Sequence, residues 1–387
     1  MTKTIVILGA GLAGLPVAHY LLSRTAATHK DIRVVLVNPS DTFYWSLASP
    51  RIVLPDQLAE DKYMWSIPEL FAKYPASQFE FVAGKAETLS PDDNSVVVRL
   101  AADGSARTIA YHTVVVATGA DARENMPWKP LGSSRETRDA IAKLRGDIQG
   151  AKSIVVAGGG VTGVELAGEL GAAYAKAGLK EVTLVVADSL PLERRMMKRA
   201  RVSARQQLEK LGVKVLLDSR VTGVSQDGSK QKLEISRQGG TTTTTLETDV
   251  FVPTYGVVLN TQFAPAAMKD AEGRLAQDAT LRAPGHANVF VLGDAGNLQP
   301  MQGINVEGQL RHLTGQFDAY LRGGAVAEYK FDGTKIMMSV SVGPSGGTGQ
   351  FGNIKPFNWL VGMMRKQLGT QYSKDYAAGV RTLFGKW

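Results

Sequence analysis

The first fourteen residues contain the feature that most restricts how this chain can fold. Thr4 to Leu8 is a short, apolar and largely β-branched run, which is typical of a buried strand. It leads directly into Gly9, Gly11 and Gly14 in the spacing G-x-G-x-x-G, and an apolar, helix-compatible segment follows. Strand, glycine turn and helix in this order form a dinucleotide-binding turn, because the glycines let a pyrophosphate approach the backbone at the N-terminus of the helix.

The same order of residues returns in the middle of the chain, and this repetition strengthens the interpretation of the first copy. Alone, the first copy is a weak signal, because residues 4–22 are also apolar and long enough to suggest a membrane span. The second copy has a strand over residues 154–157 and glycines at Gly158, Gly160 and Gly163. The two copies together predict two dinucleotide sites in one chain.

The residue that ends the second strand of such a unit is usually an acid that binds the ribose hydroxyls. In the first unit it is Asn38, whose hydrogen bond to a hydroxyl is weaker than that of a carboxylate. The second unit ends in Val-Val-Ala-Asp at 185–188, with no acid at the usual position. A helix is predicted over 192–211, and four of its basic residues can meet a 2′-phosphate or form a solvated face: Arg194, Arg195, Lys198 and Arg199. The choice between NADH and NADPH stays open.

Composition excludes several classes of protein. The 387 residues include no cysteine, which rules out disulfides, thiolate metal sites and dithiol redox chemistry. The five histidines are scattered without metal-ligand spacing, so we expect no metal site. The net charge of +8 suits anionic cofactors or an anionic membrane surface, and nucleic acid ranks last because no nucleic-acid-binding motif is visible. The first residues carry no signal-peptide or myristoylation pattern, so we expect a cytoplasmic protein.

Four motifs together identify a family. They are GAGLAG at 9–14, VVVATG at 114–119, GGGVTGVELAGEL at 158–170 and VFVLGD at 289–294. In their order and spacing the chain resembles the flavoproteins with two dinucleotide-binding domains, the pyridine nucleotide–disulfide oxidoreductase superfamily. Within it the chain is most similar to the apoptosis-inducing-factor-like, mitochondrion-associated branch of the ferroptosis-suppressor type, and next to the type II NADH:quinone dehydrogenases.

The resemblance implies a fold and a division into domains. The fold class is α/β, with two Rossmann-like domains of three-layer ββα architecture and a small C-terminal α+β segment. A discontinuous FAD-binding domain comprises residues 1–120 and 257–328. The NAD(P)H-binding domain comprises residues 121–256, and the C-terminal segment comprises residues 329–387.

The resemblance also implies two cofactors, FAD and either NADH or NADPH. The nicotinamide dinucleotide is expected at Gly158, Gly160 and Gly163. Arg51 is expected near the FAD pyrophosphate, and Asp294 at the ribitol hydroxyls or phosphate of the flavin. The full set of residues expected to bind FAD is Gly9, Gly11, Gly14, Asn38, Arg51, Val82, Thr118, Gly119 and Asp294.

Glu165 is the expected catalytic residue. It lies on the first turn of the helix after the second glycine motif, and the family pattern GGGxxGxE brings this acid near the nicotinamide and the flavin. It is expected to steer the nicotinamide or to relay a proton to the acceptor. The alternative is a structural acid that merely complements the helix N-terminus. Glu169 is expected to be solvated or to serve packing, and Gln302 and Glu307 are candidates for the acceptor site.

The chain changes character from about Tyr329 onward. A glycine-rich stretch is followed by an aromatic and basic tail in which Phe357, Trp359 and Met363 have roughly helical spacing. This tail can pack on the body as a final helix or lie on a membrane surface. By family resemblance, the membrane is the mitochondrial outer surface or that of a lipid droplet, and contact is peripheral, without a transmembrane helix.

The expected activity is that of an FAD-dependent NAD(P)H oxidoreductase with a quinone-like acceptor. No side-chain nucleophile is needed, because the flavin carries the hydride transfer. Two alternatives remain open. One is a reductase of a small iron–sulfur protein, whose acidic surface would suit the positive charge of this chain. The other is a flavin-bearing signalling or interaction protein of the apoptosis-inducing-factor type.

Overall fold

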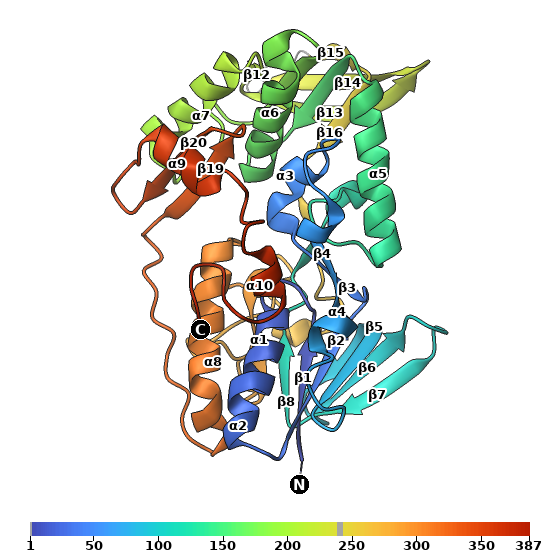
Figure 1. The fold of residues 1–387 in the computed structure, drawn as a ribbon, viewed down its shortest axis with the longest axis vertical. Coiled ribbons are helices and arrows are strands. Elements are labelled where there is room, and N and C mark those ends of the chain that lie inside the picture. Colours follow the sequence, from blue (N-terminus) through green and yellow to red (C-terminus); the bar gives the residue numbers. More distant parts are fainter. Residues whose placement is uncertain (1, 238–242) are drawn as a thin grey trace.

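A computed structural model describes residues 2–237 and 243–387, and its two largest sheets lie in opposite halves of an elongated molecule (Figure 1). The first sheet has seven strands in the order β18-β8-β1-β2-β5-β6-β7. The strands from β18 to β5 pair in parallel, and β6 and β7 extend the sheet in antiparallel fashion. Their bounds are β1 (Lys3–Leu8), β2 (Ile32–Asn38), β5 (Phe79–Ser90), β6 (Ser95–Leu100), β7 (Ala106–Ala110), β8 (Thr113–Val116) and β18 (Val289–Val291).

Helices cover one face of this sheet, where α1 (Gly14–Tyr20) lies beside α8 (Gly303–Leu321) (Figure 1). The chain continues from α1 through one π-helical turn over Leu21–Thr25 into the short α2 (Ala26–Thr28). Residues 4–22 are therefore a strand, a turn and a helix buried inside a domain. Within the two described ranges, no helix combines the length and the hydropathy needed to cross a bilayer.

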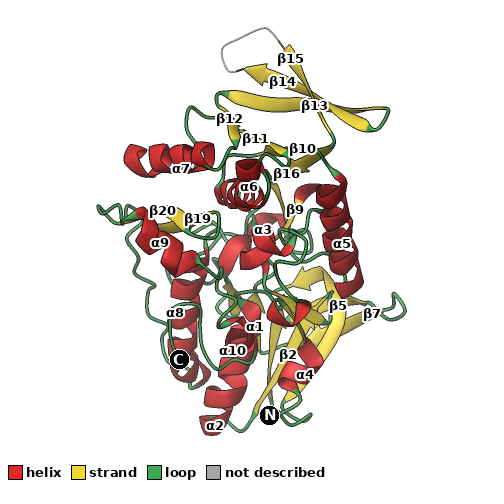
Figure 2. Cartoon of the chain, turned by 45° about the horizontal axis from the view of Figure 1, so that its top comes forward, coloured by secondary structure: helices red, strands yellow, loops and turns green. Residues whose placement is uncertain are grey.

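The second half repeats the plan of the first. A four-stranded parallel sheet has the order β12-β11-β10-β16, and a three-stranded antiparallel sheet lies against it. The parallel strands are β10 (Ser153–Ala157), β11 (Glu181–Val185), β12 (Lys214–Leu216) and β16 (Val250–Pro253), and the antiparallel strands are β13 (Ser219–Asp227), β14 (Lys230–Arg237) and β15 (Thr243–Thr248). The helices are α5 (Ser134–Gly150), α6 (Val161–Ala173) and α7 (Lys198–Lys210) (Figure 2). The predicted α/β fold class with two Rossmann-like units is confirmed.

Local sequence sets where these helices begin. Ser133 caps α5: its hydroxyl accepts from the amide of Glu136 and donates to the Glu136 carboxylate. The helix predicted over 192–211 begins later than expected, at Lys198. Leu192 has a φ of +67° and donates its amide to the carbonyl of Gly159 at 2.6 Å, which holds the preceding loop against the second glycine turn.

Short elements connect the two halves. The chain passes from the first to the second through β9 (Ala120–Ala122) and returns through β17 (Val257–Leu259), and these two strands pair in antiparallel fashion. The remaining elements of the first half lie near the crossing: β3 (Thr42–Tyr44), α3 (Ser49–Ile52), β4 (Met64–Ser66) and α4 (Ile67–Phe71). Of these, α3 contacts α6 of the second half.

The C-terminal segment contacts both halves. The hairpin of β19 (Met337–Val342) and β20 (Gly346–Phe351) contacts α6 and α7, and α9 (Asn358–Arg365) covers that hairpin. The chain then returns to the first half, where α10 (Ser373–Ala377) contacts α1 (Figure 1). The tail is therefore an integral part of the body, as one of the two alternatives from the sequence predicted.

Candidate functional site

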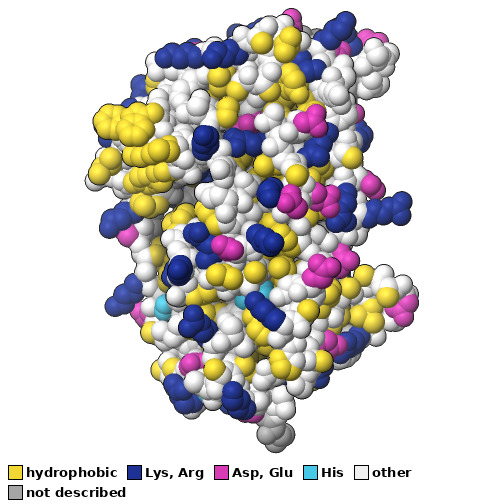
Figure 3. Space-filling view, in the orientation of Figure 1, with side chains coloured by type: hydrophobic (Ala, Val, Ile, Leu, Met, Phe, Trp, Pro, Cys, Tyr) yellow, Lys and Arg dark blue, Asp and Glu magenta, His cyan; other side chains and the backbone are white. Residues whose placement is uncertain are grey.

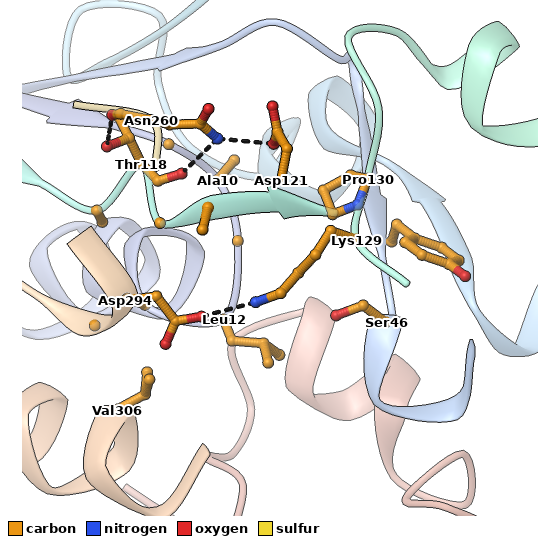
Figure 4. Close-up of a pocket in the computed structure, with 18 of the residues that line it drawn as sticks. Ala10, Leu12, Ser46, Thr118, Asp121, Lys129, Pro130, Asn260, Asp294 and Val306 are labelled. Carbon is orange, nitrogen blue, oxygen red and sulfur yellow. Dashed lines mark hydrogen bonds and ion pairs between the residues drawn. The ribbon is translucent and has the colours of Figure 1, made fainter. Parts of the chain in front are cut away.

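A cavity of about 890 Å³ lies where the two halves and the tail meet (Figure 4). Its volume falls in the range of sites that bind cofactors or other small molecules. It is lined by the first glycine turn, by segments at the carboxyl ends of β2 and β8, by the connector between the two halves, and by the tail. The lining segments that matter below are 8–13, 37–40, 84–87, 117–121, 128–132, 161–165, 292–294 and 301–306.

The first glycine turn has the geometry that a pyrophosphate requires. Gly9 has a φ of +99°, and a Cβ on it would lie 2.5 Å from the carbonyl oxygen of Ala117. A Cβ on Gly14 would collide with the carbonyl oxygen of Gly9, so helix and strand approach as closely as glycine allows. A Cβ on Gly11 would meet nothing, which leaves the open approach to the backbone that a phosphate uses. The turn therefore fits FAD as expected from the sequence.

Asn38 lines the cavity and also holds the turn in shape. Its Oδ1 accepts from the amide of Ala10 at 2.9 Å, and its Nδ2 donates to the carbonyl of Ser40 at 2.7 Å. An ionised carboxylate at this position could accept from the Ala10 amide but could not donate to the Ser40 carbonyl, so only the amide side chain can make both bonds. Its contact with a ribose hydroxyl stays a prediction.

Asp294 lies in the cavity wall and is paired with Lys129, a residue that no sequence motif marks. The Nζ of Lys129 lies 2.7 Å from Oδ2 of Asp294, and Figure 4 shows this pair reaching across the cavity. Lys129 comes from the connector between β9 and α5, which the motifs do not cover. In the sequence, Lys129 is a single cation between Trp128 and Pro130 in a stretch predicted to be a linker, and nothing there indicates a binding role.

Thr118 and Gly119 also line the cavity, in a polar cluster that joins the two crossings of the chain. The hydroxyl of Thr118 donates to the carbonyl of Asn260 at 2.6 Å, and Nδ2 of Asn260 donates to Asp121 at 2.7 Å (Figure 4). Gly119 adopts a φ of +61°. These bonds fix the end of β8 against the returning strand.

Three of the residues expected to bind FAD lie outside the cavity lining: Gly14, just past the last lining residue of the turn at Ala13, and Val82 and Arg51. Val82 is a buried core residue on β5 paired with Val37, and the lining on that strand begins at Gly84. Arg51 is buried against the second half, where its guanidinium donates to both carboxylate oxygens of Glu169 and to the carbonyl of Lys366. Packing on β5 uses the Val82 side chain and an ion pair uses that of Arg51. Their contacts with FAD stay predictions.

The second glycine turn repeats the first in detail. Gly158 has a φ of +123°, and a Cβ on it would lie 2.5 Å from the Thr254 hydroxyl oxygen. A Cβ on Gly163 would collide with the carbonyl oxygen of Gly158, and a Cβ on Gly160 would meet nothing. This turn therefore also fits a dinucleotide, and the start of α6 that follows it lines the same cavity as the first turn.

Glu165 lies in the cavity wall, buried, and the C-terminal segment supplies both of its donors. Its Oε1 accepts from the amide of Ser341 at 3.0 Å and from Nη2 of Arg365 at 2.8 Å. Burial opposes the charge of Arg365, but the neighbouring Glu165 carboxylate raises the pKa of the guanidinium overall. Glu165 is thus a fixed acid in the wall of the cavity, and neither donor was foreseen from the sequence.

Of the three remaining candidates, the two acids, Glu169 and Glu307, have structural roles. Glu169 was expected to be solvated or to serve packing; it is buried, which raises the pKa of its carboxyl group, and the pairing with Arg51 opposes that shift. Gln302 lines the cavity, as a candidate for the acceptor site should. Glu307 does not: it is buried and accepts from Arg311, from the hydroxyl of Thr382 and from the Leu383 amide, so it anchors the tail.

Comparisons with known proteins agree with this geometry. The family described as pyridine nucleotide-disulphide oxidoreductase matches residues 3–309. The chain is 34% identical over 369 residues to oxidoreductase ptaL of Pestalotiopsis fici, covering 95% of this chain and 96% of that protein. It is 25% identical over 368 residues to ferroptosis suppressor protein 1 of Xenopus tropicalis, covering 94% of this chain and 92% of that one.

Solved structures share the fold at low sequence identity. The sulfide:quinone oxidoreductase of Aquifex aeolicus superposes with a TM-score of 0.78 at 14% identity, over 98% of this chain and 92% of that one. NDH2 of Plasmodium falciparum, in complex with NADH, superposes with a TM-score of 0.74 at 12% identity, over 92% of each chain. Both branches to which the sequence motifs pointed are thus represented among the similar proteins.

Proposed function

Because the chain belongs to the pyridine nucleotide-disulphide oxidoreductase family, we propose that it oxidises NADH or NADPH through FAD and passes the electrons to a quinone-like acceptor. The oxidoreductase class and the expected cofactors, FAD with NADH or NADPH, are confirmed by that membership. The disulphide chemistry in the family name does not apply, since the sequence has no cysteine. The acceptor is the part that we propose.

One observation supports this proposal above the others: the cavity joins the first glycine turn to Glu165 of the second unit. FAD, when bound there, accepts a hydride from a nicotinamide and releases electrons to an acceptor. The protein brings the two dinucleotides together, because α6 begins at the second turn and its Glu165 lies in the wall of the first cavity. The glycines of the second turn lie outside the lining, to which α6 contributes Val161, Thr162 and Glu165.

The tail supplies the features that favour a hydrophobic acceptor. Met337 and Phe384 line the cavity, and both side chains are largely exposed, so they mark its opening to solvent. An apolar opening suits a quinone ring better than it suits a small polar oxidant. Glu165, held by Arg365, can deliver a proton to the acceptor, since it is the acid that lies both in the wall and on the nicotinamide side.

An anaerobic titration of the purified protein, reconstituted with FAD, tests the proposal. We expect NADH or NADPH to bleach the flavin absorbance and a short-chain quinone to restore it. Restoration by an iron–sulfur protein but not by quinones would contradict the quinone acceptor, and a flavin that neither donor bleaches would favour the signalling alternative.

The role of Glu165 has a separate test. We expect Glu165→Gln to slow quinone reduction at least tenfold, while Glu181→Gln, an exposed acid on β11, leaves the rate unchanged. The two variants remove the same charge from the same half of the molecule. Equal rates in the wild type and Glu165→Gln would remove Glu165 from the mechanism.

We also propose that the outer face of α9 lies on an anionic membrane surface, from which a hydrophobic acceptor would reach the cavity. Val361 and Gly362 face inward against the hairpin, whereas Phe357 and Trp359 are 72% and 64% exposed. With Ile354, Met363 and Met364 they form the α9 patch, and Figure 3 shows hydrophobic side chains gathered at the left edge where α9 lies in Figure 1. Several cations lie next to these apolar residues: Arg199, Lys355 and Lys366.

Flotation with liposomes that contain anionic lipid tests the α9 patch. We expect the double variant Trp359→Ser, Met363→Ser to lose flotation, and the wild type to lose it as salt rises. The matched control is Val257→Ser, Val258→Ser, which removes two exposed apolar side chains from β17 and should float as the wild type does. Point substitutions are used instead of a truncation, because removing the tail would also remove Arg365, which donates to Glu165. Equal flotation of both variants would contradict the membrane contact.

A further inference from the structure

We propose that the nicotinamide site is built for NADPH, with the 2′-phosphate of the adenosine ribose bound by Arg194. This inference rests on the proposed function, because it names the donor for the same reaction. Family membership leaves NADH and NADPH as equal candidates. The observations that separate them lie in the loop between β11 and α7.

The two glycine turns, compared by their hydrogen bonds, identify the ribose position of the second unit. In the first unit the leading glycine donates its amide to the carbonyl of Val37 at 2.8 Å, and Asn38 follows. In the second unit the leading glycine donates to the carbonyl of Val185 at 2.9 Å, and Val186 follows. Val186 is therefore the counterpart of Asn38, at the position where an NADH-selective site carries an acid.

Val186 can neither bind a 2′-hydroxyl nor repel a 2′-phosphate. Its side chain is buried against the turn, so closely that a Cβ on Gly159 would lie 2.6 Å from one of its methyl groups. The ribose position at this strand end is thus occupied by an apolar side chain that packs against the turn. A dinucleotide that binds here meets no carboxylate at its ribose from this strand end, and that removes the usual reason for a preference for NADH.

Asp188 is the nearest acid along the chain, and two arginines compensate its charge. Its Oδ2 accepts from Nε of Arg194 at 2.8 Å and from Nη2 of Arg201 at 3.0 Å, and Oδ1 accepts from the amide of Ser189. The hydrogen bond from Arg194 contributes most to a pKa lowered to about 2. Asp188 is consequently an ionised anchor that orients Arg194, with a net positive charge around it.

Arg194 is oriented but still has donors to offer. Only its Nε is bonded within the described residues, and its side chain is 72% exposed, so both Nη groups are available to a ligand. Arg201, in contrast, is buried and donates to the carbonyls of Leu190 and Pro191, which is a structural role. A guanidinium with a free pair of amino groups matches the oxygens of a phosphate.

The loop that carries Arg194 is fixed next to the dinucleotide turn. The amide of Leu192, two residues before Arg194, donates to the carbonyl of Gly159. The loop itself carries two arginines and two acids, and the first turn of α7 adds Lys198, Arg199 and Arg201. Residues 186–201 together therefore carry net positive charge next to the ribose position that Val186 marks.

Binding of two adenosine nucleotides to the protein reconstituted with FAD tests the assignment, by calorimetry and without turnover. We expect adenosine 2′,5′-bisphosphate to bind at least tenfold more tightly than adenosine 5′-monophosphate. We expect Arg194→Gln to remove that difference and Arg195→Gln to keep it, since Arg195 is a neighbouring exposed arginine that pairs with Glu193. Equal affinities in the wild type, or equal losses for both variants, would overturn the proposal.

Flavin reduction provides the second readout. We expect NADPH to reduce the flavin more efficiently than NADH, Arg194→Gln to raise the KM for NADPH alone, and Val186→Glu to invert the preference. A change of Arg194→Gln that affects both donors equally would mark a structural role and overturn the assignment. Failure of the proposed function looks different: neither donor would bleach the flavin, while the bisphosphate would still bind more tightly.

Discussion

At the scale of single residues, His19 is a buried group whose protonation the fold opposes. Its ring is fully buried and stacks on Phe71 with centroids 3.9 Å apart. One ring nitrogen lies 2.9 Å from the carbonyl of Ala377 and the other 3.1 Å from the Tyr74 hydroxyl. Burial, with a contribution from the positive charge of Lys73, lowers the pKa of His19 to about 3.

This lowered pKa predicts a loss of stability in acid. Below about pH 6.5 the unfolded chain binds a proton at His19, while folded His19 stays neutral until about pH 3. The free energy of unfolding should therefore decrease as the pH is lowered across that window, by about 1.4 kcal/mol per pH unit from His19. Thermal midpoints at pH 7, 6, 5 and 4 measure the slope. His19→Gln, which cannot titrate, should show a shallower slope between pH 6.5 and 4, and parallel slopes would contradict the prediction.

At the scale of elements, the two glycine turns have the same geometry. The same substitution, made in one turn at a time, should therefore show which cofactor each turn binds. We expect Gly14→Ala to weaken FAD binding at least tenfold, because its Cβ collides with the Gly9 carbonyl. We expect Gly163→Ala to leave FAD bound and to abolish reduction by either nicotinamide donor, through the equivalent collision at the second turn. Retained flavin absorbance after gel filtration and the rate of bleaching distinguish the two. Loss of flavin from both variants would contradict separate sites.

The elements that a local pattern encodes could be predicted from the sequence. Both turns, the fold class and the position of Glu165 in the cavity follow from glycine spacing beside an apolar strand, which is information within about twenty residues. Lys129 and Arg365 could not be predicted, because their partners lie 165 and 200 residues away along the chain and no motif marks either cation. The pairing of Arg51 with Glu169 could not be predicted for the same reason, since the two residues are 118 positions apart.

At the scale of the whole molecule, the Arg51–Glu169 pair joins the two halves through a buried contact between α3 and α6. We expect Arg51→Met to lower stability by about 3–5 kcal/mol, because it leaves the Glu169 carboxylate buried without a partner. Differential scanning calorimetry measures the change, as a lower unfolding temperature. Removing the arginine also removes the charge that opposes the burial-raised pKa of the Glu169 carboxyl group, so the variant's stability should fall more steeply as pH rises through the range where Glu169 ionises.

The double variant Arg51→Met, Glu169→Leu is the control for that prediction. It replaces both charges with apolar groups of similar size, so we expect most of the lost stability to return. If the double variant is no more stable than Arg51→Met, the loss comes from the contacts of the arginine stem or from its bond to the Lys366 carbonyl rather than from an uncompensated charge.

The position of the tail has a consequence for the order in which this protein is made. The hydroxyl of Tyr376 donates to the carbonyl of Leu12, across 364 residues of sequence. The turn leaves the ribosome well before α10 does, so the wall that the tail contributes cannot form until the 364 residues that follow Leu12, up to Tyr376, have been made. A nascent chain therefore exposes its first dinucleotide turn while those residues are made, and the cofactor can enter before the tail encloses it.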